Sequence, residues 1–242
     1  MKVAILLLAA GRGTRLGADI PKAYLRLGSA PLLVHSAARL LAAVPARDQC
    51  ELLVLVHPAD RSEHLAGCIE TLRALVPNTV ELKIVDGGAT RQESMALGLA
   101  ATATDSDLIM VHDAARALVP IKRSQECLNL AAEVGAAMLA VPAADTLKKV
   151  MEGFVVETLD RSPIWYAQTP QIARRDLFLH ACAHAQKTGF QVTDDASLLE
   201  HAGVKVAILE GSTGNLKITR PDDLPLAEAL LERDPTPLSN ET

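Results

Sequence analysis

The chain has 242 residues, a formal net charge of −5 at pH 7 and 49% hydrophobic residues. Its length suits one large α/β domain, because two domains would each be rather small. The negative charge argues against a general nucleic-acid binder, which needs an excess of Lys and Arg on one face. With only one Trp, two Tyr and three Phe, the core must consist of Leu, Val, Ile and Ala, as in parallel sheets covered by helices.

The first apolar run, residues 3–8, could belong to a secretion signal or to a buried strand. It is too short to span a membrane, and a loop rich in Gly and Arg follows it in place of a small-residue cleavage site. This pattern favours a strand, and no later segment is a candidate for a membrane span. We therefore expect no membrane partner.

The cysteines lie far apart in the sequence, with no CxxC pair and no His at metal-ligand spacing. They are Cys50, Cys68, Cys127 and Cys182. This arrangement suggests neither a disulfide framework nor a zinc site. We expect free thiols in a reducing cytoplasm.

Apolar runs rich in β-branched residues alternate along the chain with longer helical patterns. The strand-like runs are 3–8, 52–56, 80–85, 108–111, 137–141 and 204–209. The helical patterns are 32–44, 62–75, 91–101, 124–133, 176–187, 194–201 and 222–232. Right-handed crossovers between such elements predict a doubly wound α/β fold with a mostly parallel sheet.

The segment 142–171 breaks this alternation, because two short strand-like runs flank Glu152 and Gly153 and no helix lies between them. Gly153 fits a hairpin turn. Nothing in a parallel sheet would cover the apolar residues of this hairpin, so we expect it to leave the domain as an arm and pack on a second copy. Those residues are Val155, Val156, Ile164 and Trp165. An ordinary surface hairpin is the alternative.

Residues 1–233, including the 142–171 arm, are accordingly predicted to form a single domain. The remaining residues, 234–242, are polar and contain proline. We expect this C-terminal tail to be frayed.

The loop after the first strand runs from Ala9 to Gly17 and is followed by Lys22. Ligands of open parallel sheets bind at the carboxyl ends of the strands, and glycines let consecutive N–H groups surround an anion. The third glycine stands one position too late for a dinucleotide fingerprint, and no Gly-Lys-Ser/Thr follows as in a P-loop. The three cations Arg12, Arg15 and Lys22 suit a triphosphate, unless they are solvated side chains of a tight turn.

Later loops add polar residues at the same edge of the sheet. Gly87 and Gly88 permit a close approach of the backbone to a base, although Gly-Gly turns are common. Asp113 and Arg116 could face one cleft, or Asp113 could cap the next turn and pair with Arg116. Lys217 should point away from its apolar neighbours and would be a phosphate ligand if that face lines the cleft.

Taken together, these segments resemble the 2-C-methyl-D-erythritol 4-phosphate cytidylyltransferases of the non-mevalonate isoprenoid pathway. The resemblance runs nearly end to end, through LAAGRGTRLG, PKAYL, VDGGATRQESM, VHDAAR, DTLKK, LDRSPIWYAQTPQ, TDDAS and NLKITRPDDL. Many sugar-nucleotide transferases share the first segment, whereas the combination of VHDAAR, TPQ, TDDAS and KITRPDDL is narrower. Ala89 and Ala117 depart from the family, which frequently has Asp and Pro there.

The resemblance implies a Rossmann-like nucleotidyltransferase fold and a homodimer formed through the hairpin arm. It assigns cytidine binding to Ala9, Ala10, Gly11, Gly13, Gly88, Ser94 and Ala114. It assigns the triphosphate and the transition state to Arg15 and Lys22. Methylerythritol phosphate would contact Asp113, Arg116, Thr169, Thr193 and Lys217, with Thr146 and Arg161 of the partner's arm. Mg²⁺ would be held mainly by the nucleotide's phosphates, with no dedicated protein cage.

The expected reaction is an in-line attack by the polyol phosphate on the α-phosphorus of CTP, helped by positioning and by the cations Arg15, Lys22, Arg161 and Lys217. A ribitol 5-phosphate cytidylyltransferase is the nearest alternative, because it shares the glycine loop, HDAAR and TPQ. A non-catalytic nucleotide-binding protein would be favoured if a catalytic cation were missing. The glycine spacing speaks against an NAD-dependent dehydrogenase.

Overall fold

A seven-stranded sheet forms the centre of the computed structural model, which describes residues 1–11 and 20–238. The strand order is β11-β7-β10-β6-β1-β4-β5, and β10 is antiparallel to both of its neighbours while the other pairs are parallel. The strands are β1 (Lys2–Leu8), β4 (Gln49–Val56), β5 (Glu81–Asp86), β6 (Leu108–Asp113), β7 (Ala136–Pro142), β10 (Trp165–Arg174) and β11 (Ala207–Glu210). The predicted mostly parallel α/β sheet is confirmed.

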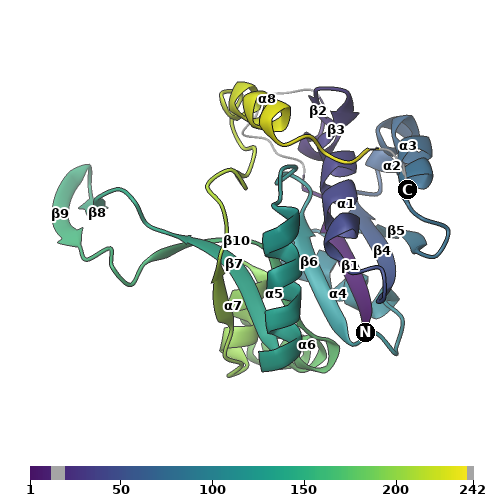
Figure 1. Cartoon of the computed structure of the whole chain (residues 1–242). Coiled ribbons are helices and arrows are strands. Elements are labelled where there is room, and N and C mark those ends of the chain that lie inside the picture. Colours follow the sequence, from purple (N-terminus) through teal and green to yellow (C-terminus); the bar gives the residue numbers. More distant parts are fainter. Residues whose placement is uncertain (12–19, 239–242) are drawn as a thin grey trace.

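Helices cover both faces of this sheet (Figure 1). One face packs against α1 (Leu32–Ala43), α3 (Ile69–Leu75) and α5 (Ile121–Val134). The other packs against α4 (Arg91–Ala101), α6 (Arg175–Thr188) and α7 (Asp195–His201). The central strand β1 feeds both cores in alternation, because successive side chains of a strand point to opposite faces: Ile5 and Leu7 lie in the first core, Leu6 in the second.

A third, smaller apolar cluster lies beside the carboxyl ends of the strands. It joins the helix α8 (Asp223–Arg233) to the two-stranded ribbon of β2 (Arg26–Leu27) and β3 (Ala30–Pro31). The same cluster contains Leu118, which follows β6, and Ile218, which follows Lys217. It therefore packs together the segments that carry several of the predicted site residues.

The single helix predicted for residues 62–75 is wrong. The structure has α2 (Asp60–Glu63), a 3₁₀ turn η3 (Leu65–Gly67) and then α3. Gly67 ends the 3₁₀ turn at the break, and a glycine inside a helix costs about 1 kcal/mol relative to Ala. The sequence of residues 62–75 has the spacing of apolar residues typical of a helix, but the backbone forms no single continuous helix there.

The sequence analysis also missed β10 as a member of the main sheet. Residues 142–171 were predicted as one arm, whereas Trp165 already pairs with Pro142 and the strand continues between β7 and β6 to Arg174. An irregularity between Ala167 and Gln171, which includes the cis peptide bond Thr169–Pro170, interrupts the pairing. The polar residues of this stretch interrupt the apolar run by which a buried strand is predicted from sequence.

Between β7 and β10, strands β8 (Leu147–Met151) and β9 (Phe154–Leu159) form a separate hairpin that stands away from the body of the protein (Figure 1). Glu152 and Gly153 form its tip with φ angles of 50° and 85°. Two consecutive positive φ angles are those of a two-residue hairpin turn whose twist matches that of the strands. The predicted hairpin around Gly153 is therefore confirmed.

The start of the C-terminal tail is attached to the body, although the sequence predicted fraying from residue 234. Arg39, 1% exposed in α1, forms an ion pair with Asp234 at 2.7 Å and donates from Nε to Thr236 Oγ1 at 3.0 Å. A buried guanidinium needs such partners, because its desolvation is costly. The tail residues supply them.

No helix within residues 1–11 and 20–238 is long and apolar enough to cross a membrane. The four cysteines are free thiols, and burial raises the pKa of each, most strongly for Cys50 and Cys127, to about 12. Raised thiol pKa values leave little of the reactive thiolate at neutral pH.

Candidate functional site

A cleft of about 280 Å³ opens at the carboxyl ends of β1, β5 and β6. This is the edge at which open parallel sheets bind their ligands. Among the described residues, its lining consists of Leu8, Ala9, Ala10, Gly11, Lys22, Ala23, Gly88, Ala89, Thr90, Arg91, Ser94, Asp113, Ala114, Ala115 and Lys217.

The cleft brings together most of the predicted nucleotide-binding residues: Ala9, Ala10, Gly11, Gly88, Ser94 and Ala114. Two predicted catalytic cations, Lys22 and Lys217, also line it, although nearly 200 residues separate them in sequence. Asp113 of the predicted substrate contacts is a third member of the wall. Gly13 and Arg15 lie outside the described residues.

The loop between β5 and α4 is shaped by glycines and by a capping box. A Cβ on Gly87 would lie 2.5 Å from Ala10 Cβ, so only glycine allows this loop to approach the loop after β1 so closely. Thr90 accepts from Glu93 N at 3.1 Å, and Glu93 Oε2 accepts in return from Thr90 N at 3.3 Å. Ser94 Oγ accepts from Gly88 N at 3.0 Å, which fixes this wall.

Asp113 is the centre of a charge network at the end of β6. One of its carboxylate oxygens accepts from Arg91, and the other lies 2.6 Å from Lys217 Nζ. Burial would raise the pKa of Asp113, but the two cations outweigh it and hold the pKa well below its usual range. The alternative of an ion pair between Asp113 and Arg116 is wrong, since Arg91 and Lys217 take both oxygens.

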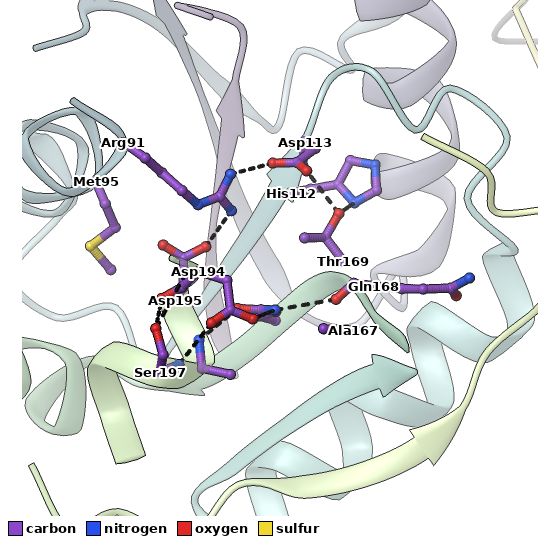
Figure 2. A network of polar contacts seen from close by, with 12 residues as sticks. Arg91, Met95, His112, Asp113, Ala167, Gln168, Thr169, Asp194, Asp195 and Ser197 are labelled. Atoms are coloured by element: carbon purple, nitrogen blue, oxygen red, sulfur yellow. Dashed lines mark hydrogen bonds and ion pairs between the residues drawn. The ribbon is translucent and has the colours of Figure 1, made fainter. Parts of the chain in front are cut away.

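Arg91 is a site residue to which the sequence analysis assigned no role. Its guanidinium bridges Asp113 and Asp195, reaching Asp195 Oδ2 at 2.6 Å (Figure 2). Arg91 is the first residue of α4, where the helix dipole disfavours a cation. That unfavourable position is the signal that could have indicated a pair of acidic partners.

The two carboxylates that share Arg91 shift in opposite directions. Burial raises the pKa of Asp195 more than Arg91 lowers it, and the neighbouring carboxylates of Asp113 and Asp194 add to the rise. Asp113 has a second cation, Lys217, which Asp195 lacks. The cleft-facing carboxylate is therefore the one held firmly ionised, and Asp195 completes the pairing of Arg91 from behind.

Arg116 and Thr169 lie next to this network and do not line the cleft. The Arg116 guanidinium donates to the carbonyl oxygens of Asn215 at 2.7 Å and Ala167 at 3.2 Å. Thr169 is 3% exposed, and its hydroxyl contacts Asp113 N at 3.2 Å and His112 Nδ1 at 2.9 Å. Both residues thus connect β6 to β10 and to the loop before Lys217.

The remaining predicted contacts do not line the described part of the cleft. Thr193 is exposed and precedes α7, whose N-cap is Asp194. Thr146 and Arg161 are exposed at the base of the arm. The Arg161 guanidinium donates to the Ala144 carbonyl of its own chain.

The described residues contain no group of three His, Cys, Asp or Glu side chains placed to hold a metal ion. Asp113 is the acid in the cleft wall, and both of its oxygens are occupied by cations.

Comparison with known proteins shows which family this chain is similar to. The family model for 2-C-methyl-D-erythritol 4-phosphate cytidylyltransferase matches residues 3–233. The protein of that name from Geobacillus kaustophilus is 40% identical over 232 residues, which are 96% of this chain and 97% of the relative. The one from Symbiobacterium thermophilum is 40% identical over 234 residues, covering 96% of this chain and 94% of the relative.

A solved structure agrees with the sequence relatives. The crystal structure of 2-C-methyl-D-erythritol 4-phosphate cytidylyltransferase from Thermus thermophilus superimposes with a TM-score of 0.77 at 33% sequence identity. The match covers 96% of this chain and 100% of that one. The similarity therefore covers nearly the whole length of both chains.

Proposed function

The chain belongs to the 2-C-methyl-D-erythritol 4-phosphate cytidylyltransferase family, and we propose that the cleft at the ends of β1, β5 and β6 is its active site. There the cytidylyl group of CTP is transferred to 2-C-methyl-D-erythritol 4-phosphate, with release of pyrophosphate, as a step toward isoprenoid precursors. The observation that carries this assignment is one cleft lined by the described start of the glycine loop (Ala9 to Gly11), Lys22 and the Asp113–Lys217 ion pair. Such a site offers backbone N–H groups and cations to phosphates.

The nucleotide occupies the side of the cleft formed by the loops after β1 and β5. Ala9, Ala10 and Gly11 offer backbone there, and Gly88 and Ser94 form the facing wall. The tight packing of Gly87 on Ala10 fixes the spacing between the two loops. A fixed spacing suits the recognition of a planar base, because little order has to be gained on binding.

The polyol phosphate occupies the side of Asp113 and Lys217, next to which Arg116 holds the loop before Lys217. Its phosphate oxygen attacks the α-phosphorus of CTP in line, so a P–O bond forms as the bond to pyrophosphate breaks. The nucleophile is already an anion, and no covalent enzyme intermediate is needed. The main obstacle is the approach of two anions, which the positive charges of Arg15, Lys22 and Lys217 counter.

Mg²⁺ belongs to this proposal as an ion carried on the phosphates of CTP. In the described part of its wall, the cleft offers the cations Lys22, Arg91 and Lys217 and the carboxylate of Asp113, whose two oxygens are paired with Arg91 and Lys217. Mg²⁺ keeps several of its waters and commonly binds through substrate phosphates. When bound, it would neutralise part of the charge of the triphosphate.

The arm belongs to a homodimer in the same proposal. Phe154 is 76% exposed, and Met151, Val150, Val155 and Val156 are each more than half exposed on the hairpin. An isolated two-stranded hairpin is marginally stable in water, so these apolar residues call for a partner surface. A second copy would cover them, and its arm would bring Thr146 and Arg161 to the polyol phosphate.

A single assay tests the assigned reaction. The purified protein is incubated with Mg²⁺, each nucleoside triphosphate in turn, and either methylerythritol phosphate or ribitol 5-phosphate. We expect pyrophosphate only with CTP, and faster release with methylerythritol phosphate. A preference for ribitol phosphate, or no pyrophosphate with any pair, would refute the assignment.

A further inference from the structure

Two polar residues, His35 and Ser36, lie next to each other in the otherwise apolar first half of α1, and the proposed reaction gives neither a role. They are 1% and 0% exposed. A buried polar side chain is costly unless a hydrogen bond replaces its lost hydration, so each residue needs a partner. Both partners are backbone carbonyls of segments that carry cleft residues, Leu27 O for His35 and Ala114 O for Ser36.

We propose that His35 and Ser36 are positioning residues that attach the two sides of the cleft to one helix and so set how far Lys22 lies from Lys217. His35 holds the side of Lys22, and Ser36 holds the side of Lys217. This inference rests on the proposed function and deepens it, because it assigns the support of two predicted catalytic cations.

Lys22 is joined to the start of α1 by two successive backbone hydrogen bonds. It is the first residue of the 3₁₀ turn η2 (Lys22–Tyr24), and Leu25 N donates to the Lys22 carbonyl at 3.1 Å. The Leu25 carbonyl accepts in turn from the N–H of Leu32, the first residue of α1, at 2.9 Å. A single 3₁₀ turn has poor hydrogen-bond geometry of its own. Its position therefore depends on the helix to which it is attached.

His35 adds a second attachment about one turn further along α1. Its Nε2 lies 2.8 Å from the carbonyl oxygen of Leu27, the last residue of β2. A carbonyl oxygen can only accept, so Nε2 carries the proton and donates it. Burial lowers the pKa of His35, although its carbonyl contacts oppose this shift, and the imidazole stays neutral at neutral pH. The segment that begins at Lys22 is thus held by α1 at two points.

Ser36 attaches the other side of the cleft to α1. Its hydroxyl donates to the Ala114 carbonyl at 3.0 Å, although a serine in a helix can instead bond back to the preceding turn. Ala114 directly follows Asp113, whose carboxylate lies 2.6 Å from Lys217 Nζ. The next carbonyl along the chain accepts from the backbone N–H that follows Lys217, at 2.9 Å. Lys217 is therefore held through residues on both sides of Ala114.

The two attachments share one rigid element, because His35 and Ser36 are consecutive residues of α1. The helix is itself fixed by its apolar face, which places Leu33 and Val34 in the first core. Catalysis by positioned groups is sensitive to small shifts, and a misplacement of about 1 Å can cost about a hundredfold in rate. A common anchor is thus a direct way to keep two lysines from distant parts of the sequence in register.

Steady-state kinetics on the full-length protein test the inference. Ser36→Ala removes the donor to Ala114 O, and His35→Leu removes the donor to Leu27 O. We expect each to lower kcat about tenfold and to change KM for CTP by less than about threefold, because a loop without its attachment shifts a lysine that is needed most in the transition state. His35→Gln, whose amide can donate in place of Nε2, should recover most of the loss.

Ser124→Ala is the matched control for Ser36→Ala. Ser124 is also fully buried in a helix, α5, but its hydroxyl has no hydrogen-bond partner among the described residues. Its removal should leave kcat unchanged. If Ser36→Ala retains the kcat of Ser124→Ala, or if His35→Gln is as impaired as His35→Leu, the inference is overturned.

Double variants distinguish positioning from a general loss of stability. In a Lys22→Ala protein, His35→Leu should lower kcat by less than about twofold further, because it acts through a lysine that is already absent. Ser36→Ala should behave in the same way in a Lys217→Ala protein. Losses that multiply in either background would mean that the helix contacts do not act through these lysines, which contradicts the inference.

A chemical measurement tests the same geometry without turnover, so that its failure can be told apart from failure of the proposed function. The short amine cross-linker disuccinimidyl glutarate is added to the ligand-free protein, and mass spectrometry follows the cross-linked peptide that joins Lys22 to Lys217. We expect it to form more slowly in Ser36→Ala and His35→Leu than in Ser124→Ala, because two groups react at a rate set by their distance and orientation. Equal or faster formation would refute the common anchor even in a protein that turns over CTP.

Discussion

The cleft and the hairpin arm differ in how their side chains are buried and paired. In the cleft wall, Asp113 is buried and both of its oxygens have cationic partners within the same chain. On the arm, Phe154 is 76% exposed, and the exposed Arg161 guanidinium donates to the backbone carbonyl of Ala144. The charges around Asp113 are paired within one chain, whereas the arm leaves apolar side chains exposed.

This difference indicates how the site is assembled. Folding of one chain fixes the charges around Asp113 before any ligand arrives, which is the preorganisation that electrostatic catalysis requires. In the proposed homodimer, the arm would gain a fixed geometry when the second copy covers it, because two strands alone bury little apolar area. Substitutions in the cleft should therefore act within one protomer, and substitutions at the base of the arm should act across two.

The largest effect is expected from substitution of Lys22 and Arg15. Lys22→Ala and Arg15→Ala should each lower kcat about a hundredfold or more, the usual cost of removing a preorganised charge donor. KM for CTP should change much less, because the positive charge is needed most in the transition state. Steady-state kinetics at varied CTP concentrations measure both constants.

Lys187→Ala, in the last turn of α6, is a matched control that removes a Lys outside the cleft. An unchanged kcat with a raised KM for CTP in the Lys22 or Arg15 variant would show that these cations bind only the ground state. These cations would then not stabilise the transition state more than bound CTP, and the cleft would not be preorganised for catalysis as its contrast with the arm implies.

A second effect, on stability rather than on rate, is expected from Arg91. Arg91→Met leaves Asp113 and Asp195 without their shared cation, and breaking a buried ion pair in this way typically costs about 3–5 kcal/mol. Urea denaturation measures the loss in the free energy of unfolding. Arg73→Met is the control, because the Arg73–Glu70 pair is exposed on both sides and should contribute below about 1 kcal/mol. Equal effects of the two substitutions would contradict a preorganised network.

The sequence alone predicted those parts of the fold that depend on periodic burial. Residues 3–8 alternate between two cores, and a strand buried on both faces leaves a continuous apolar run. The loops after β1, β5 and β6 could be placed at one edge because the ends of parallel strands meet there. The cleft therefore followed from the order of the elements.

Other features could not be predicted because their causes are nonlocal. β10 reads as a polar segment, since Gln168, Thr169 and Gln171 satisfy partners on β6, α7 and the loop before Lys217. Arg91 bridges acids that are 22 and 104 positions away in the sequence. Arg39 anchors the tail in a similar way. In each case the partner becomes visible only when the chain is folded.

The smallest expected effect is a partial return of activity when two inactive variants are mixed. This experiment tests most directly whether the arm and the cleft of one site come from different chains. Arg161→Ala and Lys22→Ala are each expected to be folded and nearly inactive. If the arms cross, each mixed dimer has one site without either residue and one site with both. Random exchange makes about half of the dimers mixed and leaves one working site in each, so activity should return to about a quarter of that of the unsubstituted protein under the two-fold symmetry of an isologous pair.

Subunit exchange is verified with differently tagged chains, and a mixture of two Lys22→Ala preparations serves as the control that should stay inactive. Activity that remains at the level of the separate variants, despite proven exchange, would mean that Arg161 acts within its own chain or not at all. The arm would then be a dimer contact without a role in the partner's site. A return to about a quarter would instead establish that each complete site combines a cleft fixed by one chain with an arginine supplied by the other, because no other pairing of these variants restores both residues to one site.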